Sequence, residues 1–208
     1  MSHFCKRFKF SITALWRATF LVGICVTLLL MAIPASAAPT MPTFVAAGIT
    51  FPVTDTPTDV AIADLDGDGK PELVESSDAG DSITVLRNTS TVGVINTASF
   101  ATPALSFTTG SNSDPQNLAI GDLDGNGKLD IVTANHGGGT VSVFLNTSTT
   151  GSISFAARTD FLADTSPAGV AIGDLDGDGN PDLVVTNEGS NTVIVLRNTN
   201  VGAGSIAF

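Results

Sequence analysis

One acidic stretch occurs three times in the chain, at residues 61–74, 119–132 and 171–184, and it constrains the fold more than any other feature. The similarity continues beyond these stretches, because related segments (VLRNTSTVGVINTASF, VFLNTSTTGSISF and VLRNTNVGAGSIAF) follow them at similar distances. A phenylalanine also recurs at intervals of 56, 55 and 53 residues, at Phe44, Phe100, Phe155 and Phe208. Repeats of about this length determine the architecture of a chain, because each repeat forms one structural unit that packs against its neighbours.

Each repeat carries the sequence signals of short β-strands. A short apolar run precedes the acidic stretch, a second follows it, and an alternating β-branched run (ITVL, VSVF or VIVL) comes after a turn. The segment after each recurring phenylalanine, such as FAARTDFLAD, indicates a fourth and more exposed strand. Beyond the first 37 residues, no segment has a convincing helical period. Four short strands per repeat are typical of a β-propeller blade, so we expect an all-β fold of three four-stranded blades.

The first 37 residues differ from the repeats. Four basic residues lie among residues 6–17, an uncharged apolar run covers residues 18–33, and Ala35-Ser36-Ala37 follows. This order is typical of a secretory signal peptide at residues 1–37, and the apolar run is shorter than the roughly 20 residues of a membrane-spanning helix. An uncleaved membrane anchor is the alternative. The three repeats are then expected at about 38–98, 99–153 and 154–208.

Removal of a signal peptide changes the charge of the chain. The sequence has nine lysine and arginine residues and 20 aspartate and glutamate residues, and four of the basic residues leave with the signal, so the mature charge is 5 − 20 = −15. This excess argues against binding of nucleic acid or of an anionic membrane surface. Cys5 and Cys25 are also removed, so the mature chain cannot form an internal disulfide. A secreted chain of this kind needs another stabilising element, and metal ions are the obvious candidate.

The three acidic stretches share one pattern of oxygen-bearing side chains. Counted from the first aspartate, carboxylate or amide side chains occupy offsets 1, 3, 5 and 9, and offset 6 is always glycine. Alternating oxygen ligands, a glycine that allows a sharp turn and a final carboxylate are suited to Ca²⁺, to which offset 7 would lend its backbone carbonyl. The predicted ligands are Asp64, Asp66, Asp68, Lys70 and Glu72 in the first loop, Asp122, Asp124, Asn126, Lys128 and Asp130 in the second, and Asp174, Asp176, Asp178, Asn180 and Asp182 in the third.

Other interpretations of these loops are weaker. The loops contain no histidine or cysteine, which disfavours zinc and copper, and Mg²⁺ prefers a tighter octahedron with more water. An EF-hand would carry a glutamate at offset 12, but Glu75 has Thr133 and Val185 as its counterparts. Turns built only by hydrogen bonds between side chains and backbone are the remaining alternative. We therefore expect calcium to hold the clustered carboxylates together.

The stretches GDLDGDGNPDLVVTN and GDLDGNGKLDIVTANHGGGTVSVFLN resemble the repeat of the FG-GAP/VCBS family, which is related to the propeller of integrin alpha subunits. The resemblance covers essentially the whole mature chain, although the absence of the GAP tripeptide makes it closer to the bacterial branch. It implies that each loop joins two strands of a blade and binds Ca²⁺. Asn126 removes a charge from the second site and Glu72 lengthens the last ligand of the first, so the expected order of affinity is third, first, second.

The resemblance also raises the question of blade number. Propellers of this family usually have about seven blades, and three blades cannot close a ring. We therefore expect the chain to be part of a larger seven-bladed propeller, since it ends at Phe208, where a further repeat would begin. The alternative is a three-blade unit that closes by self-association through its open blade edges.

Catalysis has little support in the sequence. The segment HGGG at residues 136–139 resembles a lipase oxyanion loop, but the G-x-S-x-G nucleophile motif is absent and the other repeats have turn residues at this position. We expect a non-catalytic module, secreted or held at the cell surface, that serves adhesion and binds an extracellular protein or glycan. The alternative is the substrate-targeting part of a longer secreted enzyme.

Overall fold

The computed structural model describes residues 48–53 and 55–208. The predicted signal peptide lies outside these residues. The part of the chain that is described consists of strands joined by turns and loops, and it contains no helix long and apolar enough to span a bilayer. The predicted all-β fold is confirmed.

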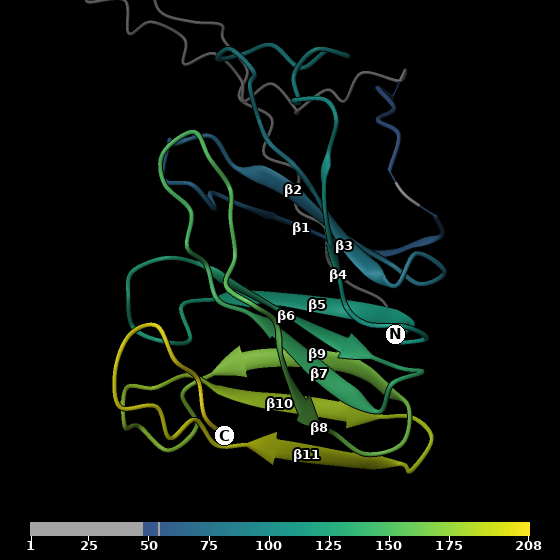
Figure 1. Cartoon of the computed structure of the whole chain (residues 1–208), viewed down its shortest axis with the longest axis vertical. Coiled ribbons are helices and arrows are strands. Elements are labelled where there is room, and N and C mark those ends of the chain that lie inside the picture. The colour runs from purple at the N-terminus through teal and green to yellow at the C-terminus, as the bar shows by residue number, and fades with distance from the viewer. Residues whose placement is uncertain (1–47, 54) are drawn as a thin grey trace, which may run out of the picture. The chain divides into compact units, whose positions relative to one another are not determined.

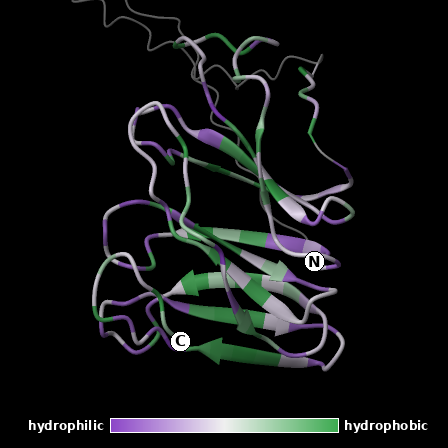
Figure 2. Cartoon of the chain, viewed as in Figure 1, coloured by the Kyte–Doolittle hydropathy of each residue, from purple (hydrophilic) through white to green (hydrophobic). Residues whose placement is uncertain are grey.

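Within the described residues, eleven strands form three antiparallel sheets, which we call blades 1, 2 and 3 (Figure 1). Strands that are consecutive in the sequence are also neighbours in each sheet, as in a propeller blade. Figure 2 shows that apolar residues concentrate in the strands and polar residues in the loops. Blade 1 contains β1 (Pro57–Ala63), β2 (Glu72–Ser77), β3 (Ser82–Leu86) and β4 (Leu105–Thr108); blade 2 contains β5 (Pro115–Gly121), β6 (Asp130–Asn135), β7 (Thr140–Phe144) and β8 (Thr159–Leu162); blade 3 contains β9 (Pro167–Gly173), β10 (Asp182–Asn187) and β11 (Thr192–Leu196).

Blade 3 has three strands in the described residues, whereas blades 1 and 2 each have the four that were predicted. In blades 1 and 2 the fourth strand follows Phe100 or Phe155, as the sequence predicts. The corresponding phenylalanine of blade 3 is Phe208. In blades 1 and 2, the fourth strand lies near the start of the next sequence repeat. The boundaries of the sheets therefore differ from those of the sequence repeats, because the repeats at 99–153 and 154–208 each begin with the last strand of the preceding blade.

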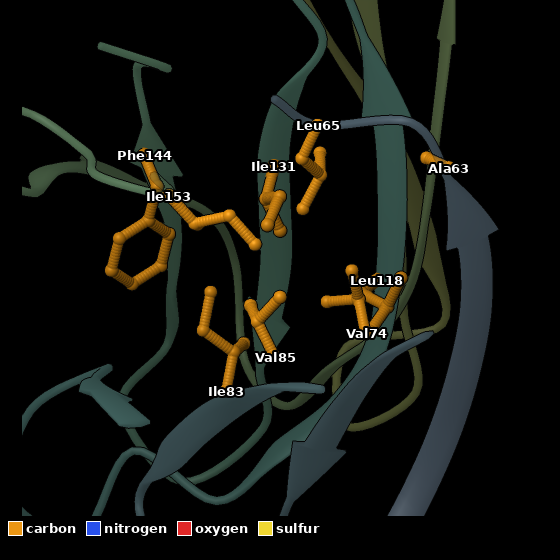
Figure 3. Close-up of a cluster of buried hydrophobic side chains, with 9 residues drawn as sticks. All are labelled: Ala63, Leu65, Val74, Ile83, Val85, Leu118, Ile131, Phe144 and Ile153. Atoms are coloured by element: carbon orange, nitrogen blue, oxygen red, sulfur yellow. The ribbon is translucent and has the colours of Figure 1, made fainter. Parts of the chain in front are cut away.

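Successive blades pack face to face. Side chains alternate between the two faces of a strand, and one face of blade 1, with Val74, Ile83 and Val85, packs against the face of blade 2 that carries Leu118 and Ile131 (Figure 3). Equivalent residues of blades 2 and 3 form a second core cluster. In every blade, we call the side equivalent to Val74, Ile83 and Val85 face A, and the side equivalent to Leu118 and Ile131 face B. Face A of one blade thus buries face B of the next.

Asparagine side chains fix the first two acidic loops to the blade that follows each of them. The Asn146 side chain donates one hydrogen bond to the carbonyl of Leu65 in blade 1 (2.9 Å) and another to the carbonyl of Leu129 in its own blade (2.8 Å). Asn198 donates the equivalent bond from blade 3 to the carbonyl of Leu123 in blade 2 (2.9 Å). Both asparagines are buried. Hydrogen bonds are stronger away from water, so these contacts define how neighbouring blades meet.

Glu75 is a poorly satisfied polar residue on face B of blade 1. Its side chain is 4% exposed, and among the described residues neither carboxylate oxygen has a partner at normal hydrogen-bond distance. Burial raises the pKa of the Glu75 carboxyl, and the neighbouring Thr84 hydroxyl offsets only part of this increase. The counterpart in blade 3 is Val185, which is fully buried. The fold therefore accepts an apolar side chain at this position.

We expect Glu75→Val to stabilise the protein by about 1–3 kcal/mol at neutral pH, because an unsatisfied buried polar group costs about this much. The gain should shrink as the pH falls through the raised pKa of Glu75, since protonation removes the buried charge. Urea unfolding at neutral and acidic pH measures both effects. Glu188→Val is the matched control, because Glu188 is exposed and this change should have little effect. A loss of stability in Glu75→Val at neutral pH would contradict this account.

Candidate functional site

Each acidic loop joins the first two strands of a blade. Two glycines shape the loop: φ is +71° at Gly67 and +85° at Gly69, and the equivalent glycines of the other loops have φ between +72° and +90°. Residues with a Cβ atom enter this left-handed region at an energetic cost. The alternation of acidic residues with glycine therefore allows the chain to turn tightly around its own carboxylates.

Three carboxylates come together in each loop. One oxygen atom from each of the residues at offsets 1, 3 and 9 lies within 4.8 Å of the other two. Ca²⁺–oxygen distances of about 2.3–2.6 Å place two ligands of one ion up to about 5 Å apart, so a single ion can contact all three residues. The groups are Asp64, Asp66 and Glu72 in blade 1, Asp122, Asp124 and Asp130 in blade 2, and Asp174, Asp176 and Asp182 in blade 3.

The carboxylate at offset 9 also closes the loop. Glu72 accepts hydrogen bonds from the backbone N–H groups of Leu65 (2.8 Å), near the start of the loop, and Asn88 (3.3 Å), beyond the end of β3. Asp130 and Asp182 make the equivalent pairs of bonds at 2.7–3.0 Å. These three carboxylates are at most 1% exposed. Each oxygen has two lone pairs, so these bonds leave capacity for a cation.

The site is electrostatically unfavourable without a counter-charge. Burial raises the pKa of Glu72 and raises the pKa of Asp130 to about 6, against the opposing effect of the backbone N–H groups. The other two carboxylates of each loop raise these pKa values further. A bound cation favours the ionised form and would reverse this effect. The close approach of three carboxylates in one loop therefore favours binding of a positively charged ligand.

The residues predicted as ligands at offsets 5 and 7 lie in the turn. Asp68 and Asp178 are not members of the carboxylate groups. Each accepts a hydrogen bond from the backbone N–H two residues later (2.8 Å), as does Asn126 (2.7 Å). These N–H groups belong to Lys70, Asn180 and Lys128. The structure thus brings nine of the fifteen predicted residues together in three carboxylate groups, while the other six shape the loop.

Two arginines that were not expected at the site neutralise part of its charge. Arg87 Nε lies 3.0 Å from Asp66 Oδ2, and Arg197 Nη2 lies 2.8 Å from Asp178 Oδ2. Arg197 also pairs with Asp176, and this hydrogen bond holds the pKa of Asp176 below its usual value. Loops 1 and 3 therefore carry an internal counter-charge.

The second loop balances its charge differently. Leu145 occupies the position of the two arginines, and the neutral Asn126 occupies the position of Asp68 and Asp178. The sequence already contains this correlation, because the two repeats with aspartate at offset 5 have an arginine after the third strand, and the repeat with Asn126 has Leu145 there. It becomes interpretable only when the pairing of the strands is known.

The loops of blades 1 and 2 are completed by the following blade. Asp66 accepts a hydrogen bond from the backbone N–H of Gly151 (3.1 Å), and Asp124 accepts one from Gly204 (2.6 Å). Asp66 and Asp124 are each 5% exposed, whereas Asp176 is exposed and, within the described residues, receives no hydrogen bond from another blade. A following blade is therefore needed to enclose an acidic loop.

The chemistry of the donors limits the kind of ligand. The three groups consist entirely of carboxylates, which suit a hard cation such as Ca²⁺ and not the softer metals. His136 lies in the turn at residues 136–139, between β6 and β7, where the N–H of Gly139 donates to the carbonyl of Asn135 (3.0 Å). The prediction that HGGG is a hairpin turn is confirmed.

Family models match the second part of the chain. A model of an FG-GAP-like repeat matches residues 122–185, and a model of the FG-GAP repeat matches residues 166–207. A comparison with curated proteins found no match. The matched segments include the second and third acidic loops and the strands that follow them. Residues 122–207 are therefore similar to FG-GAP repeats, which form the blades of a β-propeller.

Proposed function

We propose that the chain is a secreted, calcium-binding β-propeller module that binds an extracellular partner and has no catalytic activity of its own. The observation that supports calcium most directly is the threefold repetition of the carboxylate group. One acidic cluster is common on a protein surface. Three clusters at equivalent positions, each with a carboxylate buried to at least 99%, need a common cause. A hard divalent cation with oxygen ligands supplies that cause.

The three carboxylates of each loop would contact the ion from different parts of the blade. The carboxylates at offsets 1 and 3 would contact calcium from the loop, and the buried carboxylate at offset 9 would contact it while retaining its two backbone hydrogen bonds. In this way the ion would join the start of the loop to the second and third strands. Calcium when bound supplies charge neutralisation and cross-linking of the loop. The function of the sites is then structural.

Calorimetric titration of the chelated protein with calcium tests this proposal. We expect three sites per chain, with dissociation constants of about 10⁻⁴–10⁻³ M, which are typical of extracellular calcium modules. Asp124→Ala should remove the second site and leave the other two. A titration without calcium uptake would show that the loops are turns built by hydrogen bonds alone.

Arg197 competes with calcium at the third loop in this account. We expect Arg197→Leu to tighten calcium binding there about tenfold, since a unit charge about 6 Å from a divalent ion contributes about 1.4 kcal/mol in water. Without calcium, the same change should lower the melting temperature, because Asp176 and Asp178 lose their counter-charge. Calcium titration and thermal unfolding measure the two effects.

Arg158→Leu is the matched control for this prediction. Arg158 pairs with Asp160 at 2.8 Å, outside the acidic loops, so its removal should leave calcium affinity unchanged. Equal calcium affinities in the two variants would show that Arg197 does not act on the third site.

We place the extracellular partner in the groove between the acidic loops of blades 1 and 2. This groove has a volume of about 570 Å³, and Asp64, Asp66, Lys128, Ser148 and Thr150 are among its lining residues. Carboxylates, an ammonium group and hydroxyls suit a polar ligand, which favours a glycan over an apolar molecule. A glycan array probed in calcium tests this assignment. Thr150→Trp should abolish binding by filling the groove, and binding unchanged by this substitution would exclude it.

A further inference from the structure

Asn126, in the acidic loop of blade 2, is the only asparagine of the chain that is followed by glycine. An asparagine side chain reacts slowly with the backbone nitrogen of the next residue, and glycine permits this reaction best because it has no side chain to hinder the approach. Asn126 is exposed, and a Cβ atom built on Gly127 would meet nothing within 4 Å. Asn126 and Gly127 therefore have both the sequence and the open space that deamidation requires.

The amide group of Asn126 has a structural role in the second loop. Its Nδ2 donates a hydrogen bond to Asp124 Oδ2 (3.1 Å), and its Oδ1 accepts one from the backbone N–H of Lys128 (2.7 Å). In loops 1 and 3, the carboxylate at offset 3 pairs with an arginine instead. Leu145 occupies the position of that arginine in blade 2. Within the described residues, Asn126 therefore supplies the only side-chain donor to Asp124.

We propose that Asn126 is a site of spontaneous deamidation, and that the reaction converts the second acidic loop to a more negatively charged form. The backbone nitrogen of Gly127 loses its proton and bonds to Cγ of Asn126, and the Cγ–Nδ2 bond breaks. The side-chain nitrogen takes up a proton and leaves as ammonia, so the two residues share a cyclic imide. Water then opens this ring at either carbonyl carbon, which leaves a carboxylate and releases a proton. The products are aspartate and isoaspartate, in which the main chain runs through Cγ.

The aspartate product changes the charge balance of the loop. It can still accept the N–H of Lys128, as Asp68 accepts the N–H of Lys70 in loop 1 (2.8 Å), but it cannot donate to Asp124. Two carboxylates then lie side by side without an arginine, so the metal-free loop becomes less stable. The effect on calcium rests on the function proposed above. The added charge should tighten the second site about tenfold, as expected for Arg197→Leu at the third, since each change makes one loop more negative by one unit.

The folded loop restrains this reaction. Ring closure requires the Asn126 side chain to leave Asp124 and the N–H of Lys128. It also requires the N–H of Gly127 to leave Asp122 Oδ2, to which it donates at 2.8 Å. Asp122 and Asp124 both belong to the carboxylate group of the second loop, so a bound calcium ion would hold both acceptors in place. Calcium should therefore slow the deamidation of Asn126, and chelation should accelerate it.

Peptide mapping by mass spectrometry tests the proposal on the full-length chain, incubated at neutral pH in calcium or in chelator. We expect the amide of Asn126 to be lost before those of Asn96 and Asn191, which are exposed but precede threonine. The loss should be faster in chelator. Asp178→Asn places an asparagine before Gly179 in the equivalent turn of loop 3, and it should create a second site of loss. Retention of the amide at Asn126, or equal rates of loss at all three natural asparagines, would overturn the proposal.

Two substitutions of Asn126 separate the consequence of deamidation from the reaction itself. Asn126→Asp reproduces the aspartate product, so it should bind calcium about tenfold more tightly at the second site and melt at a lower temperature in chelator. Asn126→Gln is the matched control, because it keeps a neutral amide but must close a larger ring, and it should retain this amide during the same incubation. An Asn126→Asp variant with unchanged calcium affinity and melting temperature would overturn the expected change in charge balance.

The mapping experiment does not depend on calcium uptake, which calorimetry measures on the same samples. Amide loss at Asn126 in a chain that takes up no calcium would support the deamidation site and refute the proposed calcium binding. Calcium uptake without loss of this amide would do the reverse.

Discussion

Chelation of calcium is expected to lower the stability of the protein by about 2–5 kcal/mol relative to its stability in about 2 mM calcium. This range follows from three sites with dissociation constants of about 10⁻⁴–10⁻³ M, each contributing RT ln(1 + [Ca²⁺]/Kd). For a domain of this size, it corresponds to a decrease of about 5–15 °C in melting temperature. The physical cause is the repulsion among the carboxylates of each loop, one of which is fully buried. Calorimetric unfolding with and without chelator measures the decrease.

Single substitutions show whether the effect arises in the acidic loops. Asp176→Ala removes a member of a carboxylate group and should abolish most of the calcium-dependent stabilisation at its site. Asn126→Ala removes a neutral side chain that accepts the Lys128 N–H at the turn, and it should do less harm. Equal losses in the two variants would contradict the assignment of the ligands.

The pH dependence of stability should change sign when calcium is removed. The pKa of Asp130 is about 6 in the folded chain, above the value of about 3.9 for an unfolded aspartate. Without metal, the folded state above pH 6 must therefore hold an unfavourable buried charge, and this cost disappears as the pH falls toward 4. At 1.36 kcal/mol per pKa unit, the raised pKa of Asp130 alone lowers the free energy of unfolding by about 3 kcal/mol at neutral pH. In calcium the ionised form is the ligand, so acidification should instead release the ion and destabilise the protein.

Asp130→Asn isolates this effect from the other titrating groups. The variant keeps the size of the side chain but has no charge to bury. The difference in unfolding free energy between the original chain and the variant, measured by urea unfolding, should favour the original chain increasingly as the pH falls without calcium. The opposite trend is expected in calcium. A difference that is independent of pH under both conditions would show that Asp130 remains ionised and solvated.

Much of the fold was predictable because its determinants are local. Each acidic loop, its glycines and the apolar runs beside it lie within fourteen residues, at 61–74 in the first repeat. The alternating strands such as Ser82–Leu86 follow at once, and meander pairing requires only short connections. The carboxylates at offsets 1, 3 and 9 were found for the same reason.

The features that sequence reasoning missed depend on contacts between distant residues. Arg87 lies 21 residues after Asp66, and the two meet because β2 and β3 pair with Leu73 opposite Leu86. The shift between sheets and repeats has the same origin, since β4 pairs with β3 and not with the strands that follow it in its own repeat. The enclosure of Asp66 by Gly151 spans 85 residues and requires knowledge of how blades pack.

Native mass spectrometry of the purified chain tests the central claim most directly, because it counts bound ions. We predict three calcium ions per chain, none after chelation, and two in each of the variants Asp66→Ala, Asp124→Ala and Asp176→Ala. A chain that carries no calcium, or a count that these substitutions leave unchanged, would contradict the assignment of the three carboxylate groups as calcium sites.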